Sequence, residues 1–142
     1  FTDEEKRAKM MEKRMRKLEW IVKELRPPEL YGHVDAELTF IGWGSTFGTI
    51  REAMKRLEDE YEIKTNHLHI KYLWPFHVDY VSEMLRSCKK MLDVEINYSA
   101  QLARLIRMET GIKIEDRLLK YDGEPFQSDM LVDKVRRVLS NA

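Results

Sequence analysis

Short apolar runs alternate with stretches of helical periodicity from residue 36 to the end of this chain. The runs that predict strands cover residues 38–41, 68–73, 91–94 and 118–121. After each run, apolar residues recur every three or four positions, over residues 47–61, 78–88, 102–109 and 128–139. Strands and helices that alternate at this spacing form βαβ units with parallel strands. The sequence therefore predicts a three-layer, Rossmann-like α/β fold with a mainly parallel sheet of four to five strands.

The first 26 residues follow a different pattern. Residues 3–25 predict one long helix, which Thr2 or Asp3 caps and which Pro27 and Pro28 end. Its apolar residues recur at alternating steps of three and four and form a seam of about 2.5 heptads. The seam consists of Ala8, Met11, Met15, Leu18, Val22 and Leu25. Such a seam packs on its own domain or on a neighbouring domain or subunit. The candidate contact residues are Met11, Met15, Leu18 and Val22.

The expected organisation has three parts. Residues 1–26 form an amphipathic linker helix from an upstream domain, residues 27–35 form a proline-containing linker, and residues 36–142 form the α/β domain. The chain begins with Phe1 rather than methionine, which indicates a piece of a longer protein. We therefore expect the function to belong to a larger whole.

Composition argues against several classes of function. Lys+Arg and Asp+Glu number 25 each, and this zero balance argues against nucleic acid or a membrane surface as the main partner. No apolar run approaches the roughly 18 residues of a membrane span, and the charged N-terminus is unlike a signal peptide. The single cysteine, Cys88, excludes an internal disulfide and an iron–sulfur site made by this chain alone. These features predict a cytoplasmic protein.

A glycine-rich turn follows the first predicted strand. Its candidate ligand or interface residues are Gly42, Gly44, Ser45, Thr46 and Gly48. Glycines there leave amide N–H groups free for an anion, and Glu62 follows Gly42 by twenty residues, where a ribose-binding acid would lie. However, the spacing is GxGxxxG rather than GxGxxG, and Glu62 comes after the helix instead of at the end of the next strand. The alternative is a plain glycine turn with Ser45 or Thr46 as the helix N-cap.

A polar cluster follows the third predicted strand. Glu95 and Asn97 alternate to the same side of an extended chain, and Gln101 comes one helical turn later. In a doubly wound sheet, the loops after the first and third strands flank the topological switch point. The cluster is therefore a candidate to face the glycine turn across one crevice. The alternative is that these residues bond to loop amides and cap the next helix.

The second predicted strand carries His67, His69 and Lys71 on one face. The unequal polarity of its two faces predicts an edge or partly covered strand, because central parallel strands are apolar on both. An H-x-H pair can bind zinc, but no third ligand is evident, so hydrogen-bonded or solvent-facing histidines are expected. The aromatic residues that follow are either core or a candidate contact with another chain: Tyr72, Trp74 and Phe76.

The sequence offers little for hydrolytic chemistry. Ser45 and Cys88 have no evident base partner, and no motif of paired carboxylates is apparent. Cys88 lies on the inner face of a predicted helix, as inert core cysteines do. We therefore expect no catalytic residue and no metal site in this chain.

Five segments, in order and at matching spacing, resemble the C-terminal part of the α subunit of 2-oxoacid:ferredoxin (2-oxoacid:acceptor) oxidoreductases. They are residues 14–18 (RMRKL), 42–46 (GWGST), 67–69 with 72–76 (HLH and YLWPF), 95–97 with 101–102 (EIN and QL), and 120–126 (KYDGEPF). Ala100 stands where the family usually has glycine. The likeness covers almost the whole chain.

This resemblance implies a domain similar to the C-terminal domain of transketolase-like, thiamine-diphosphate enzymes. The intact family enzymes oxidatively decarboxylate a 2-oxoacid with coenzyme A to an acyl-CoA and CO2, and pass electrons through iron–sulfur chemistry to ferredoxin. Thiamine diphosphate and Mg²⁺ bind between an upstream domain and the β subunit, so the resemblance implies no cofactor in this chain. The implied role is architectural, in contact with the upstream domain, the β subunit and, where present, γ and δ subunits. A contact between the crevice and coenzyme A is a further hypothesis.

Two other functions fit parts of the pattern. The first is a free-standing nucleotide-binding or flavodoxin-like module that uses the turn over residues 42–48. The second is a helix-mediated oligomer built on the seam over residues 8–25.

Overall fold

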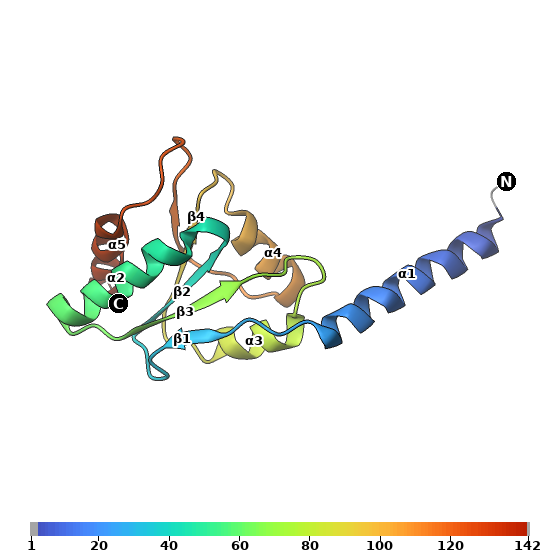
Figure 1. Ribbon diagram of the computed structural model, residues 1–142, viewed down its shortest axis with the longest axis horizontal. Coiled ribbons are helices and arrows are strands. Elements are labelled where there is room, and N and C mark those ends of the chain that lie inside the picture. Colours follow the sequence, from blue (N-terminus) through green and yellow to red (C-terminus); the bar gives the residue numbers. More distant parts are fainter. Residues whose placement is uncertain (1–2, 142) are drawn as a thin grey trace.

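The computed structural model describes residues 3–141 and contains one five-stranded sheet in the order β1-β3-β2-β4-β5 (Figure 1). The strands are β1 (Leu30–Gly32), β2 (Leu38–Trp43), β3 (Thr65–Ile70), β4 (Met91–Glu95) and β5 (Asp116–Leu119). β1 runs antiparallel to β3, whereas β3, β2, β4 and β5 are mutually parallel. The expected three-layer, mainly parallel α/β fold with a long N-terminal helix is confirmed.

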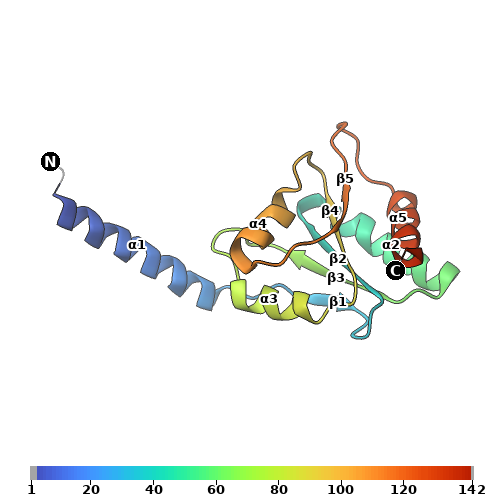
Figure 2. The same cartoon turned by 180° about the vertical axis from the view of Figure 1, so that it is seen from behind.

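Helices cover both faces of the sheet (Figures 1 and 2). On one face lie α2 (Phe47–Tyr61) and α5 (Ser128–Ser140), which bury side chains such as Leu57 and Val135 against Phe40 and Leu92. On the other face lie α3 (Val78–Arg86) and α4 (Gln101–Thr110), packed around Ile41 and Leu68. The two hydrophobic cores therefore lie on opposite sides of one sheet.

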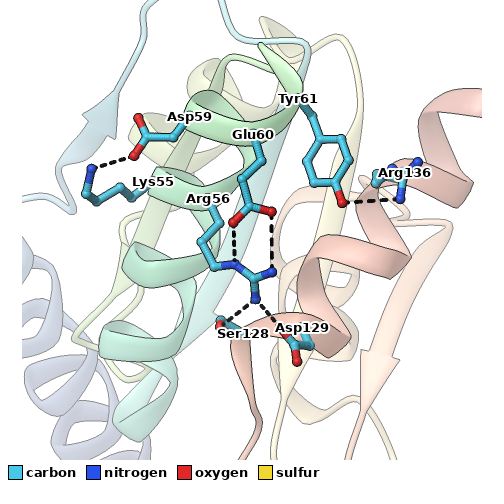
Figure 3. Close-up of polar contacts among 8 residues, drawn as sticks. All are labelled: Lys55, Arg56, Asp59, Glu60, Tyr61, Ser128, Asp129 and Arg136. Carbon is cyan, nitrogen blue, oxygen red and sulfur yellow. Dashed lines mark hydrogen bonds and ion pairs between the residues drawn. The ribbon is translucent and has the colours of Figure 1, made fainter.

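Two helices of the first face are also joined by polar contacts (Figure 3). Arg56 of α2 donates to both carboxylate oxygens of Glu60 on its own helix, and also to Ser128 and Asp129 of α5. Tyr61 lies beneath the guanidinium of Arg136, whose carbon is 4.2 Å from the ring centroid. These contacts hold α2 and α5 together where both reach the surface.

Two strand expectations are corrected by the structure. The segment at residues 27–35 contains strand β1, because Leu30–Gly32 pairs with β3 where the sequence suggested only a linker. β3 is neither an edge strand nor partly covered: it lies between β1 and β2 and is buried along its whole length. The prediction was wrong because it assumed that polar side chains face solvent, whereas His67 and His69 are buried.

Helix α1 (Glu4–Glu24) begins after Asp3, whose carboxylate accepts the backbone N–H groups of Glu5 and Lys6. It projects away from the α/β domain and meets it only at its C-terminal end (Figures 1 and 2). No residue of α1 is buried. At the junction, Nε2 of His77 lies 3.0 Å from the carbonyl oxygen of Leu25. None of the helices described in residues 3–141 has the length and apolarity to cross a membrane.

Candidate functional site at the carboxyl edge of the sheet

Strands β2 and β4 are neighbours, and the helices that follow them leave to opposite faces of the sheet. Their carboxyl ends therefore form the topological switch point, the place where α/β sheets open a crevice. The glycine turn after β2 and the polar cluster after β4 both lie there. They are joined directly, because Nε1 of Trp43 donates to Oε1 of Glu95 at 3.0 Å.

Glu95 is the centre of this edge. Its side chain is fully buried, and Oε1 also accepts the backbone N–H of Leu102 at 2.7 Å and Nδ2 of Asn97 at 3.0 Å. Oε2 accepts the N–H of Ala103 at 3.2 Å. Burial opposes ionisation, but the neighbouring Asp93 carboxyl and these donors outweigh it and lower the pKa of Glu95 below its ordinary value. An ionised carboxylate therefore occupies the positive N-terminal end of α4.

The other two residues of the polar cluster complete the same structure. The side-chain oxygen of Asn97 accepts the backbone N–H of Gln101 at 3.2 Å, while the Gln101 side chain is exposed. Ala100 precedes α4 with a φ of 53°, in the left-handed region that favours glycine. The loop therefore shows the capping arrangement that the sequence analysis held as an alternative to a ligand site.

The glycine turn is close-packed at one end and exposed at the other. A Cβ on Gly42 would lie 2.7 Å from Cδ1 of Ile50 and 2.8 Å from Oγ1 of Thr46, so a larger residue would force these two side chains to shift. The Thr46 hydroxyl donates to the Trp43 carbonyl, and neither Ser45 nor Thr46 caps α2 through its side chain. Thr46 occupies the expected N-cap position of α2 but makes no capping hydrogen bond with its side chain, and a short 3-10 turn (Gly44–Thr46) precedes the helix. Gly44, Ser45 and Gly48 are exposed.

Glu62 does not belong to this edge. It ends α2 at the opposite end of the helix, with a φ of 55°. Fifteen residues of helix span roughly 22 Å, far more than a ribose and a pyrophosphate can bridge from the turn. The geometry therefore does not favour the nucleotide-binding alternative.

Asp93 is a second buried acid that the sequence analysis did not single out. It is fully buried on the central strand β4, and neither carboxyl oxygen accepts a hydrogen bond from a described residue. Burial is the largest cause that raises the pKa of Asp93 to about 9, followed by hydrogen bonding of the protonated carboxyl to Glu95 and by the charge of Glu95. Two signals were present in the sequence: an acid inside an apolar strand, and a second acid two residues later on the same face.

The two histidines of β3 face α2 within an aromatic cluster. Nδ1 of His69 lies 3.2 Å from Nε2 of His67, and the Phe47 ring lies within 5.6 Å of both imidazoles. The Arg51 guanidinium carbon lies 4.0 Å from the centroid of Tyr31. Burial lowers the pKa of His67 to about 3, with smaller contributions from His69 and Arg51. Within residues 3–141, no three His, Cys, Asp or Glu side chains are grouped as a metal site would require.

The aromatic segment after β3 is divided by the structure. Phe76 is 5% exposed and belongs to the core, whereas Tyr72 and Trp74 are 42% and 63% exposed. A further aromatic pair lies on the loops after β4 and β5, where Tyr98 and Tyr121 meet edge to face at 4.9 Å. Sequence reasoning missed this pair. The signal was available, because each tyrosine follows the end of a parallel strand.

Comparisons with known proteins agree with this fold. A split-gene transketolase in an inactive β4 tetramer has the same fold, with a TM-score of 0.59 at 20% identity, over 82% of this chain and 43% of that one. The model of the pyruvate:ferredoxin oxidoreductase core domain II matches residues 36–125. The chain belongs to this family of oxidoreductase domains.

Two relatives are more similar in sequence. The 2-oxoacid:ferredoxin oxidoreductase subunit alpha of Saccharolobus solfataricus is 34% identical over 139 residues, which are 95% of this chain and 22% of that subunit. A 2-oxoglutarate:ferredoxin oxidoreductase from Magnetococcus marinus, solved with 2-oxoglutarate, coenzyme A and succinyl-CoA, superposes with a TM-score of 0.85 at 34% identity. That match covers 94% of this chain and 23% of the other. The chain therefore spans about a fifth of the length of these relatives.

Proposed function

We propose that this chain is the core domain II of the α subunit of a 2-oxoacid:ferredoxin oxidoreductase. The whole enzyme would oxidatively decarboxylate a 2-oxoacid with coenzyme A to an acyl-CoA and CO2, and would transfer the electrons to ferredoxin in the cytoplasm. The named relatives support this reaction, and the Magnetococcus marinus enzyme was solved with a 2-oxoacid and coenzyme A. This domain would serve as a structural and subunit-interface domain.

The Glu95 arrangement is the observation that carries the structural role. A crevice built for chemistry keeps a base or donor free for the substrate. Here the buried carboxylate accepts four internal donors, and the Asn97 side chain is bonded at both ends. The edge is therefore suited to holding β2, β4 and α4 in fixed positions.

The cofactors of the whole enzyme do not fit the residues of this domain. An iron–sulfur cluster needs several thiolates, whereas Cys88 is the single cysteine and burial raises its pKa. Mg²⁺ on a diphosphate needs free carboxylate or amide oxygens, and those of Glu95 and Asn97 accept protein N–H groups. We therefore derive no catalytic step within this domain and assign thiamine diphosphate, Mg²⁺ and the cluster to other parts of the complex.

The exposed surfaces provide the proposed contacts. Trp74 and Tyr72 are candidates for contact with the upstream domain or the β subunit. The α1 seam is a second candidate contact, and ferredoxin and γ or δ subunits would be reached through the intact complex. The exposed part of the turn, Gly44 and Ser45 with Gln101, remains the candidate contact with coenzyme A.

The activity is tested on the intact enzyme that contains this chain. Reduction of a viologen dye is measured with coenzyme A and either 2-oxoglutarate or pyruvate as the substrate. We expect reduction that requires both the 2-oxoacid and coenzyme A. An intact complex with an active β subunit that reduces the dye with neither acid would contradict the proposed reaction.

Gln101→Ala tests whether coenzyme A contacts the exposed part of this edge, because the Gln101 side chain is exposed. A contact predicts a several-fold rise of the KM for coenzyme A with an unchanged KM for the 2-oxoacid. Gln127→Ala removes an exposed amide before α5 and serves as the control. An unchanged KM for coenzyme A, or equal changes in both constants, would contradict a coenzyme A contact at Gln101.

A further inference from the structure

Arg51 of α2 is a cation without a counter-ion among the described residues. Its guanidinium carbon lies 4.0 Å from the ring centroid of Tyr31 and 4.8 Å from that of Phe47, so the two rings fix the position of the group. The ion pairs of residues 3–141 join other groups. A half-buried guanidinium that has no acid beside it is suited to an anion from outside the domain.

A groove of about 290 Å³ opens beside Arg51, where α2 meets the end of β1 and the start of β3. Because β1 is an edge strand, the groove lies apart from the carboxyl edge that carries Glu95. The polar and charged residues of its lining are His33, Arg51, Lys55, Glu58 and Thr65.

Two buried donors of this groove lack a hydrogen-bond partner among the described residues. They are Nε of Arg51 and the hydroxyl of Thr65. Thr65 is only 2% exposed, so bulk water does not satisfy its hydroxyl. The groove therefore lacks an acceptor, and an ionised carboxylate is a group that only accepts hydrogen bonds.

The other charges of the groove are matched. Nε2 of His33 lies 2.9 Å from Oε1 of Glu58, and Lys55 pairs with Asp59 one helical turn later. Within the described residues, Arg51 is thus the one cation of the lining that has no acid beside it. A singly charged anion balances it, whereas a doubly charged phosphate would leave surplus negative charge near Glu58 and Asp59.

We propose that this groove binds a small organic monocarboxylate. The guanidinium of Arg51 presents parallel N–H groups that match the two oxygens of a carboxylate, and the Thr65 hydroxyl supplies a further donor. The apolar part of the ligand lies against Met54, which also lines the groove. The rings of Tyr31 and Phe47 hold the guanidinium in place beforehand, so little side-chain entropy is lost on binding.

This site goes beyond the proposed function, and its test does not depend on the 2-oxoacid assay. The isotopically labelled 142-residue chain is titrated with propionate at constant ionic strength and followed by nuclear magnetic resonance. We expect saturable shifts of the Arg51 Nε–H and Gly32 amide signals, with a Kd on the order of 1 mM, as so small a ligand allows.

Two further ligands test the chemical class. Propionamide has nearly the same shape as propionate but no charge, and it should cause no saturable shift. Phosphate should bind more weakly than propionate, because of the surplus charge beside Glu58 and Asp59. A chain that does not respond to propionate, that responds equally to propionamide, or that binds phosphate more tightly would overturn the proposal.

Substitutions separate the site from general effects of charge. Arg51→Gln should abolish saturation, and Thr65→Val should raise the Kd several-fold while it keeps the shape of the buried side chain. Arg104→Gln is the matched control, because it removes the same charge from an exposed position on α4, at the other face of the sheet. The backbone spectrum verifies that each variant keeps the fold. Binding that survives Arg51→Gln, or that Arg104→Gln weakens equally, would overturn the site.

The rival occupant is an acidic side chain from another part of the enzyme, because this chain spans about a fifth of the length of its relatives. Phenylglyoxal, which modifies accessible arginines, distinguishes the two in the intact enzyme when the modified peptides are measured by mass spectrometry. A free ligand predicts that Arg51 is modified and that propionate protects it. An Arg51 that resists modification with and without propionate would show that the groove is already filled, which would overturn the proposal.

Discussion

At the scale of single residues, β4 carries two buried acids in opposite charge states. Glu95 accepts four hydrogen bonds at the N-terminus of α4 and is ionised, whereas Asp93 accepts none from the described residues and its pKa is raised to about 9. The two carboxyls lie on the same face, two residues apart. The donors present at one position and missing at the other decide which of them holds the charge.

Asp93→Asn should make the protein more stable relative to the unmodified chain as pH rises. The folded state keeps Asp93 protonated up to about pH 9, while the unfolded state ionises near pH 3.8, so the stability of the unmodified chain falls with pH between these values. The advantage of the variant should grow by at most about 1.4 kcal/mol per pH unit. Urea unfolding between pH 5 and pH 8 measures it.

Asp133→Asn is the matched control, because this side chain is exposed on α5. Its unfolding curves should run parallel to those of the unmodified chain. If the Asp93 variant also ran parallel, the buried acid would be ionised in the folded state.

At the scale of elements, the α2–α5 pair shows how one side chain joins two helices. Arg56 bonds to Glu60 on its own helix and to Ser128 and Asp129 on the next (Figure 3). The planar guanidinium reaches both helices because its donors point in several directions at once. Lys55 and Asp59, also drawn in Figure 3, form an ion pair within α2 alone.

Arg56→Lys should lower the melting temperature by a few degrees, because an ammonium group cannot bond to Glu60 and α5 together. The loss should shrink in 1 M NaCl, where exposed charges are screened. Lys55→Gln breaks an ion pair that does not join two helices and should have a smaller effect. Calorimetric scans at low and high salt compare the variants, and an equal effect of both substitutions would reject the inter-helix role.

At the scale of the whole molecule, the α/β domain and α1 differ in what stabilises them. The domain has two hydrophobic cores of its own, whereas α1 buries no residue and meets the domain only near Leu25. The comparison with relatives also includes α1 for the most part, because it covers 95% of the chain. A helix without a core of its own is stable only through what covers it.

Removal of residues 1–25 should leave the urea midpoint of the domain unchanged at low protein concentration. The remaining chain keeps the buried Pro28, strand β1 and both cores. A large loss of stability in the shortened chain would show that α1 packs on its own domain.

Only part of the candidate site could be predicted from the sequence. The strand ends placed Glu95 and Asn97 opposite the glycine turn, because parallel strands bring their carboxyl ends to one edge. The raised pKa of Asp93 could not be predicted from the sequence, because it depends on burial by all the neighbouring side chains. The burial of His67 and the existence of β1 could not be predicted either, because Phe47 of α2 covers the polar face of β3 and Leu30–Gly32 pairs with its edge, and both segments are distant in the sequence.

The sequence by itself determined the α/β alternation, the long N-terminal helix with its seam, and the family, because these follow from periodicity and from motifs that are local along the chain. The tertiary structure alone decided the order of the strands, the burial of β3, the opposite charge states of Asp93 and Glu95, and the exposure of the α1 seam. These properties depend on which segments lie side by side, and burial and hydrogen bonding are set by neighbours that are distant in the sequence.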